Sequence, residues 1–112
     1  YMVERKEDGR VIGTVHLFPD DRRAVEAMEV GYVIAPDCRR RGYAREAVEA
    51  VMDHLFRETD TQLIIAGVAV CNGPSVAMLE KLGFTREGMV RKAFFIPGQG
   101  AVDMVSFYRE RT

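Results

Sequence analysis

Three consecutive arginines before a glycine are the residues in this sequence best suited to bind an anion. Arg39, Arg40 and Arg41 precede Gly42, between a strand-like segment and an amphipathic helical one. A helix start carries unpaired backbone N–H groups and about half a positive charge, and small residues let an anion approach them. The segment predicts a phosphate-binding loop, with a solvated basic turn as the alternative. It lacks the glycines of a dinucleotide fingerprint and the Lys-Ser/Thr of a nucleotide P-loop.

The segments around this loop predict a strand, a helix and a second strand. Ala27–Ile34 has strand character and is followed by Pro36. From Tyr43 to Thr59, apolar residues recur at steps of three and four, which indicates an amphipathic helix. Leu63–Val70 is apolar nearly throughout, as expected for a strand covered on both faces. Together they predict a βαβ unit with parallel strands and a right-handed crossover.

The rest of the chain predicts two hairpins and a short helix. Tyr1–Lys6 and Arg10–Phe18 form the first hairpin around Asp8-Gly9, and Pro19–Arg23 is a polar loop after it. Residues Ser75–Leu82 form a short helix that begins beside a proline and ends before Gly83. Phe84–Ile96 and Ala101–Arg109 form a final antiparallel pair. The fold class is therefore α/β (α+β), with a mixed sheet.

Length and composition limit the classes of protein that remain. With 112 residues, the chain is one domain spanning residues 1–112, and 47% hydrophobic with 29% charged residues is ordinary globular composition. A net charge of −1 argues against a nucleic-acid partner, and no apolar run is long enough to span a membrane. Cys38 and Cys71 match no metal or redox spacing, which favours the cytoplasm and predicts no metal site.

Several blocks of this sequence resemble the GNAT family of N-acetyltransferases. The matching blocks are Arg39-x-x-Gly42-x-Ala44, Glu29–Ile34 with Pro36, and Asn72-x-x-Ser75 followed by Leu79–Phe84. Glu87-Gly88 and Asp103 are similar to the branch that acetylates ribosomal-protein N-termini. The resemblance covers nearly the whole chain. It implies a largely antiparallel sheet with a central splayed parallel pair, and a further strand and helices that a complete domain has before the first hairpin.

The resemblance also implies acetyl-CoA as co-substrate, bound where the two parallel strands splay apart. The strand backbone at Tyr32, Val33 and Ile34 would pair with the pantetheine amides, as an added strand does. Asn72 would reach the pantetheine arm, although Asn72-Gly73 is also ordinary turn chemistry. The cofactor-binding residues implied in this way are Tyr32, Val33, Ile34, Arg39, Arg40, Arg41, Gly42, Tyr43, Ala44, Asn72 and Ser75.

Two residues are candidates for the proton transfers of acetylation. Ser75 resembles the serine proposed as proton donor in the ribosomal branch, with helix capping as the alternative. Leu79 stands where many relatives have a tyrosine, which shifts that role towards Ser75. Glu29 would take protons from the amine, with a solvent-facing strand residue as the alternative. Some relatives carry an acidic residue on this strand, but Phe94 and its neighbours supply none. Asp103 is the other carboxylate that could face the amine, with fixing of the final hairpin as the alternative.

The expected partner besides acetyl-CoA is an amine acceptor. A protein or peptide N-terminal α-amino group is the first hypothesis, and a small-molecule amine, such as an amino acid, polyamine or antibiotic, is the second. A non-catalytic acyl-CoA-binding module and a fold fragment kept for its structure are alternatives from other classes. If no segment precedes Tyr1–Lys6, this strand is an exposed sheet edge, which predicts self-association as a homodimer.

Overall fold

The computed structural model of the protein describes residues 1–34 and 42–111. Its strands and helices, in chain order, are β1 (Met2–Glu4), β2 (Val11–Asp20), β3 (Ala27–Ile34), α1 (Tyr43–Glu58), β4 (Leu63–Ala69), α2 (Gly73–Lys81), β5 (Thr85–Ile96) and β6 (Gly100–Glu110). Each predicted strand and helix is present in this order.

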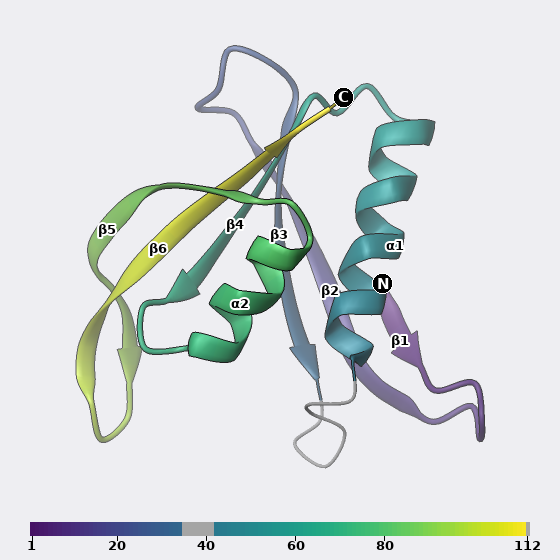
Figure 1. The fold of residues 1–112 in the computed structure, drawn as a ribbon, viewed down its shortest axis with the longest axis horizontal. Helices are drawn as coiled ribbons and strands as arrows, with labels where there is room; N and C mark the ends of the chain where they lie inside the picture. Colours follow the sequence, from purple (N-terminus) through teal and green to yellow (C-terminus); the bar gives the residue numbers. More distant parts are fainter. Residues whose placement is uncertain (35–41, 112) are drawn as a thin grey trace.

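The strands form a single sheet with the order β1-β2-β3-β4-β6-β5 (Figure 1). Neighbouring strands pair antiparallel, except that β3 and β4 are parallel. Helix α1 connects these two parallel strands. The predicted βαβ unit and the largely antiparallel mixed sheet are therefore confirmed.

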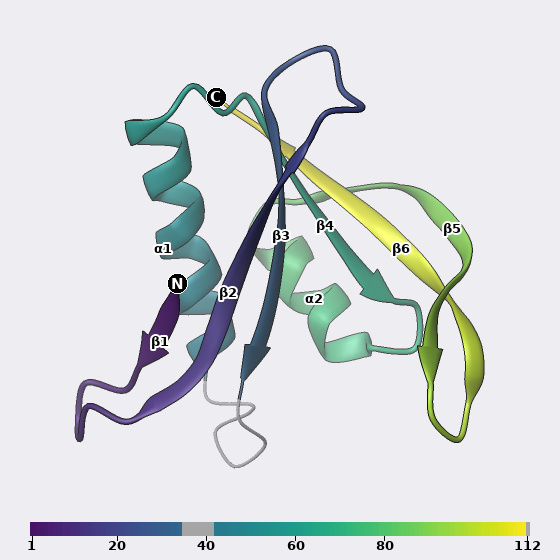
Figure 2. The same ribbon diagram turned by 180° about the vertical axis from the view of Figure 1, so that it is seen from behind.

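Both helices cover the same face of the sheet, and the opposite face carries no helix of the described part of the chain (Figures 1 and 2). The apolar stripe of α1 supplies Val48, Met52 and Leu55 to the core, and α2 supplies Leu79, which is fully buried. They pack on inward-facing strand residues such as Phe107. Burial of this stripe explains why the periodic segment forms a helix here.

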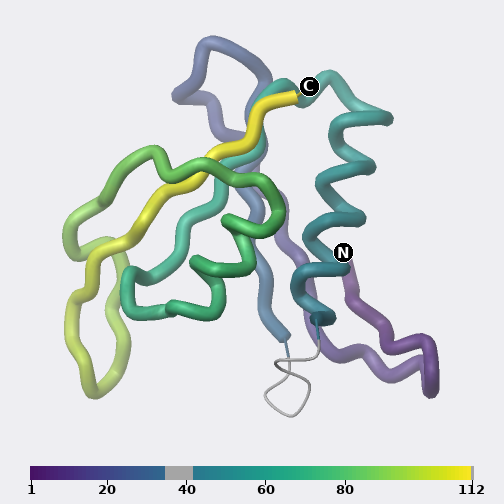
Figure 3. Tube along the Cα trace, viewed as in Figure 1, coloured from purple at the N-terminus to yellow at the C-terminus, as the bar shows by residue number. Residues whose placement is uncertain are grey.

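The β5–β6 hairpin curls away from the rest of the sheet, on the side opposite β1 (Figure 3). Its register shifts between Arg86 and Gly88 and again between Val90 and Phe94. Asp103 stabilises the backbone at the second register shift, because its carboxylate accepts hydrogen bonds from the Lys92 backbone N–H and the Arg91 guanidinium, each at 2.9 Å. The role considered for Asp103 as an anchor of the hairpin matches this contact.

Several element boundaries differ from the sequence prediction by one or two residues, and two of these differences have a clear structural cause. Strand β2 continues through Pro19 to Asp20, which pair with Met28 and Ala27, so the predicted loop begins later. Proline is tolerated there because β1 pairs with β2 only as far as Thr14, and no strand of the described residues lies beside this edge of β2 further on. Helix α2 begins at Gly73 rather than Ser75, because a different residue caps it.

Candidate functional site

The two parallel strands separate in the middle of the sheet. Pairing between β3 and β4 ends at Val30 opposite Ala66, although β3 continues to Ile34 and β4 to Ala69. The other edge of β3 remains paired with β2 throughout. Beyond Val30, the backbone of Tyr32 and Val33 therefore faces a widening gap without a β4 partner. A free strand edge of this kind is able to pair with an extended ligand.

A cleft of about 730 Å³ lies on the helix-covered side of the sheet, between β3, the start of α1 and α2. It brings together most of the residues predicted to bind the cofactor: Tyr32, Val33, Ile34, Gly42, Tyr43, Ala44, Asn72 and Ser75. The remaining three, Arg39, Arg40 and Arg41, lie outside the described residues. We call this cleft the helix-side cleft.

Gly42 is the N-cap residue of α1, and its backbone has a conformation that favours glycine. Its φ of 78° is left-handed, and its carbonyl accepts the first intrahelical hydrogen bond, from the Glu46 N–H at 3.0 Å. A Cβ at this position would meet no atom within 4 Å, so the backbone angle and not a clash within the chain requires glycine. The backbone N–H groups of the first turn of α1 are therefore accessible from the cleft, because Gly42 beside them has no side chain.

Asn72, and not Ser75, caps α2. The Asn72 Oδ1 accepts a hydrogen bond from the Ser75 backbone N–H at 3.3 Å, and Pro74 occupies the first turn of the helix. The alternative that placed Ser75 as the helix cap is therefore wrong, and Asn72 has a structural role as the N-cap of α2. The Ser75 hydroxyl is not used for capping and lines the cleft.

The side chain of Tyr32 adds a polar group that sequence reasoning missed. Its hydroxyl is buried and has no hydrogen-bond partner among the residues that the structure describes. Burial raises the pKa of Tyr32, and the nearby Ser75 side chain opposes that increase in part. Buried hydroxyls without a partner are uncommon in folded proteins. Strand alternation was the available signal, because Tyr32 follows Val30 on the core-facing side of β3.

Glu29 lies on the other face of the sheet, in a second cleft of about 410 Å³. Strand alternation explains this separation, since Glu29 and Tyr32 are an odd number of residues apart on β3. Gly67 of β4 and Ser106 of β6 also line this cleft. Asp103 and Phe94 do not belong to either cleft. We call this second site the open-face cleft.

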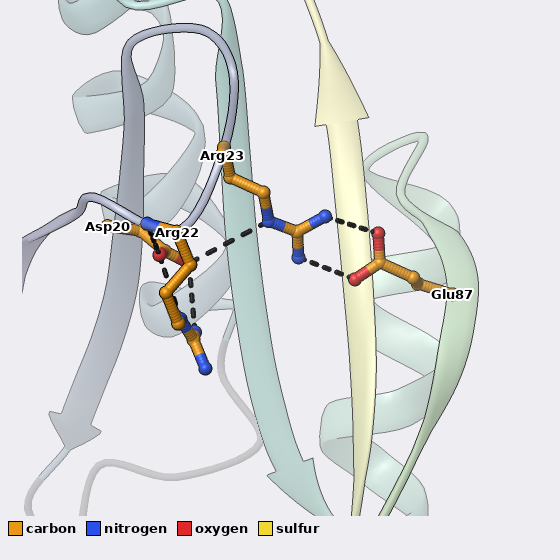
Figure 4. Close-up of polar contacts among 4 residues, drawn as sticks. All are labelled: Asp20, Arg22, Arg23 and Glu87. Atoms are coloured by element: carbon orange, nitrogen blue, oxygen red, sulfur yellow. Dashed lines mark hydrogen bonds and ion pairs between the residues drawn. The ribbon is translucent and has the colours of Figure 1, made fainter.

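An ion-pair network borders the open-face cleft (Figure 4). Arg23 donates two hydrogen bonds to the Glu87 carboxylate, from Nη1 to Oε2 at 2.8 Å and from Nη2 to Oε1 at 2.6 Å. Asp20 accepts hydrogen bonds from the backbone and the guanidinium of Arg22, which lower the pKa of Asp20 to about 2. The Arg23 guanidinium likewise holds the pKa of Glu87 below its usual range.

The sequence contained little indication of this network. Arg22 and Arg23 lie in a segment that predicts a polar loop, and Glu87 contributes only to the resemblance to one branch of the family. The pair joins residues 64 positions apart, and only the order of β3, β4, β6 and β5 in the sheet brings them together. A single sequence carries no signal for such a long-range contact.

In the described ranges, 1–34 and 42–111, neither helix is long and apolar enough to cross a membrane. The same residues contain no group of three or more His, Cys, Asp or Glu side chains that could hold a metal ion.

Comparison with known proteins identifies the family. The family model described as acetyltransferase (GNAT) domain matches residues 1–85, which is most of the chain, and the chain therefore belongs to the GNAT family. The chain is 41% identical over 91 residues to Probable N-acetyltransferase YjcK of Bacillus subtilis, covering 81% of this chain and 50% of that protein. It is 32% identical over 84 residues to spermidine N(1)-acetyltransferase of Vibrio cholerae, covering 67% of this chain and 49% of the relative.

Solved structures agree with this assignment. The ribosomal-protein-S5-alanine acetyltransferase from Vibrio fischeri superimposes with a TM-score of 0.86 at 28% sequence identity, covering 96% of this chain and 58% of the other. The chain spans about half the length of the curated relatives that it matches. The predicted family and fold are therefore confirmed.

Proposed function

We propose that the protein is an acetyl-CoA-dependent N-acetyltransferase that acetylates a primary amine, the α-amino group at a protein or peptide N-terminus. The observation that carries this proposal is the separation of β3 from β4, with one cleft on each face of the sheet beside it. Acetyl-CoA occupies the helix-side cleft and the amine occupies the open-face cleft. The acetyl group is transferred where the strands part.

The residues of the helix-side cleft suit acetyl-CoA. The backbone of Tyr32 and Val33 is a free strand edge that can pair with the pantetheine amides. The N–H groups that follow Gly42 form a binding position for the pyrophosphate. Three arginines precede this binding position in the sequence and supply positive charge and forked hydrogen-bond donors for phosphate: Arg39, Arg40 and Arg41. Acetyl-CoA itself supplies an activated acyl group.

Two residues of this chain carry out the proton transfers of the reaction, one as proton acceptor and one as proton donor. The neutral amine attacks the thioester carbon, a C–N bond forms and the C–S bond breaks. Glu29 accepts the proton that the amine nitrogen loses, directly or through water, and Ser75 donates a proton to the departing thiolate sulfur. Glu29 is available for this role, because it makes no ion pair with any residue that the structure describes. It lies one residue before the last β3–β4 pair.

The Tyr32 hydroxyl supports Ser75 as the proton donor. Both side chains line the helix-side cleft, and the buried tyrosine hydroxyl has no partner in the described part of the chain. A ligand that enters the cleft therefore finds two neighbouring hydroxyl groups, one of which is not engaged. Ser75 is free to act at the sulfur because Asn72 carries out the capping of α2.

The proposal is tested by mixing the chain with acetyl-CoA and a set of peptides and small amines. Release of free thiol, together with a mass increase of one acetyl group on the peptide N-terminus, is the expected result. Binding of acetyl-CoA without thiol release for any amine would contradict the enzymatic proposal and support a non-catalytic acyl-CoA-binding module. Acetylation of small amines but no peptide would contradict the proposed acceptor.

A further inference from the structure

We infer that the Arg23–Glu87 ion pair makes the open-face cleft selective for acceptors that carry a single positive charge. The inference rests on the proposed function, because it places the acceptor amine in this cleft. It assigns Arg23 as a residue that determines specificity and distinguishes a terminal α-amino group from a polyamine.

The geometry of the pair is that of a strong, oriented contact. Two parallel N–H···O hydrogen bonds of 2.8 and 2.6 Å join the guanidinium to the carboxylate, and both side chains are about two-thirds covered, with 27% and 34% exposed. Arg23 reaches from the β2–β3 loop across β4 and β6 to β5 (Figure 4). Its Nε also lies 3.9 Å from the buried Asp20 carboxylate. Arg23 is therefore held on both sides.

This contact sets the charge that an acceptor meets. Four charged residues line the open-face cleft: Arg22, Arg23, Glu29 and Glu87. Arg23 neutralises Glu87, and Arg22 pairs with Asp20. Glu29 is then the one lining carboxylate without an ion pair among the described residues. The cleft offers a single position for a cation, with two guanidinium groups beside it.

A second positive charge on the acceptor would find no further unpaired carboxylate in the described lining of the cleft, and it would lie beside the guanidinium groups of Arg22 and Arg23. Like charges near a partly exposed surface repel one another, and low ionic strength strengthens the effect. A peptide N-terminus presents one ammonium group and fits the single carboxylate. A polyamine presents further ammonium groups on a short flexible chain, close to Arg22 and Arg23. The charges of this cleft therefore favour the terminal α-amino group.

The experiment compares two probes of the same carbon chain, butylamine and putrescine, which differ by one ammonium group. Their dissociation constants are measured by NMR titration of the protein at low ionic strength. Arg23→Met removes a positive charge at similar volume and releases the Glu87 carboxylate. Glu87→Gln leaves Arg23 positive, with the Asp20 carboxylate, 3.9 Å from its Nε, as its remaining ion-pair partner among the described residues. Arg91→Met is the matched control, because Arg91 also pairs with a carboxylate in the β5–β6 hairpin but does not line the cleft.

The wild-type chain is expected to bind butylamine more tightly than putrescine. Arg23→Met is expected to shift the ratio of the two constants about threefold or more towards putrescine, and Glu87→Gln to shift it the other way. Arg91→Met is expected to leave the ratio unchanged. A loss of folding alone lowers both affinities together, so a shifted ratio separates specificity from a merely structural role.

An unchanged ratio in folded Arg23→Met would overturn the inference, and so would a wild-type chain that binds neither amine. A shifted ratio in a protein that releases no thiol from acetyl-CoA supports the inference and overturns the proposed enzymatic function. The two failures are therefore distinguishable.

Discussion

Ser75 and Asn72 divide two roles that the sequence offered as alternatives for Ser75. Asparagine accepts the hydrogen bond that satisfies the first turn of α2, and serine presents its hydroxyl to the helix-side cleft. The sequence Asn72-Gly73-Pro74-Ser75 was compatible with either residue as the cap, because both types are common at that position. The two side chains can therefore be tested separately.

We expect Ser75→Ala to lower turnover roughly tenfold or more, while acetyl-CoA affinity and thermal stability stay nearly unchanged, because a single general acid contributes on the order of a hundredfold or more. The control is Asn72→Ala, which removes the cap and is expected to destabilise the protein by about 1 kcal/mol. Steady-state kinetics, calorimetry with acetyl-CoA and thermal unfolding provide the three readouts. Unchanged turnover in Ser75→Ala would remove this residue from the mechanism.

Gly42 permits a prediction about cofactor binding. We expect Gly42→Val to weaken CoA binding several-fold or more, because a β-branched residue resists the left-handed angle and places bulk beside the N–H groups of α1. Gly9→Val is the matched control, since Gly9 also has a positive φ, of 69°, with nothing within 4 Å, but lies in the distant β1–β2 turn. Both variants should lose stability, but only Gly42→Val should lose CoA affinity in calorimetry.

At the scale of elements, the local pattern of apolar residues was sufficient to predict a helix or a strand where burial of those residues decides which of the two forms. The stripe of α1 and the apolar run of β4 identified both elements and their parallel relation. The continuation of β2 through Pro19 was not predicted, because it depends on β1 ending opposite Thr14. The Arg23–Glu87 pair could not be predicted, because it depends on the order of the strands in the sheet. The role of the Tyr32 side chain could not be predicted either, because it depends on the position of α2.

The end of β2 carries a pH-dependent contact. The hydrogen bonds and charge of Arg22 lower the pKa of Asp20 from 3.8 to about 2 in the folded protein. A carboxylate with a depressed pKa contributes stability above its unfolded value, and this contribution is lost as pH falls through the folded value. We therefore expect Asp20→Asn to lower the melting temperature at neutral pH, and the difference from wild type to shrink between about pH 4 and pH 2.

Thermal unfolding followed by circular dichroism across that pH range checks the expectation. Asp53→Asn is the control, because Asp53 lies on the exposed side of α1 and its side chain makes no ion pair within the described residues. A pH-independent difference between wild type and Asp20→Asn would contradict the assignment of the contact.

At the scale of the whole molecule, one face of the sheet is left without helices in residues 1–34 and 42–111. Large apolar side chains are exposed there, among them Phe18 and Val33, with 58% and 57% of their surface accessible. Burial of such side chains against a second copy is favourable in water. Self-association of this chain as a two-fold dimer stays a prediction. Light scattering that finds a monomer at high concentration would contradict it.

The short parallel pairing has a consequence for how two ligands influence one another. Four residue pairs, Ala27–Val30 with Leu63–Ala66, join two three-stranded antiparallel units, β1-β2-β3 and β4-β6-β5. Each cleft takes residues from both sides of this junction, such as Tyr32 with Ser75 and Glu29 with Gly67. We therefore expect a ligand that fixes the separation of the units to change the free energy of binding at the other cleft, and thermodynamic linkage makes such a coupling equal in both directions.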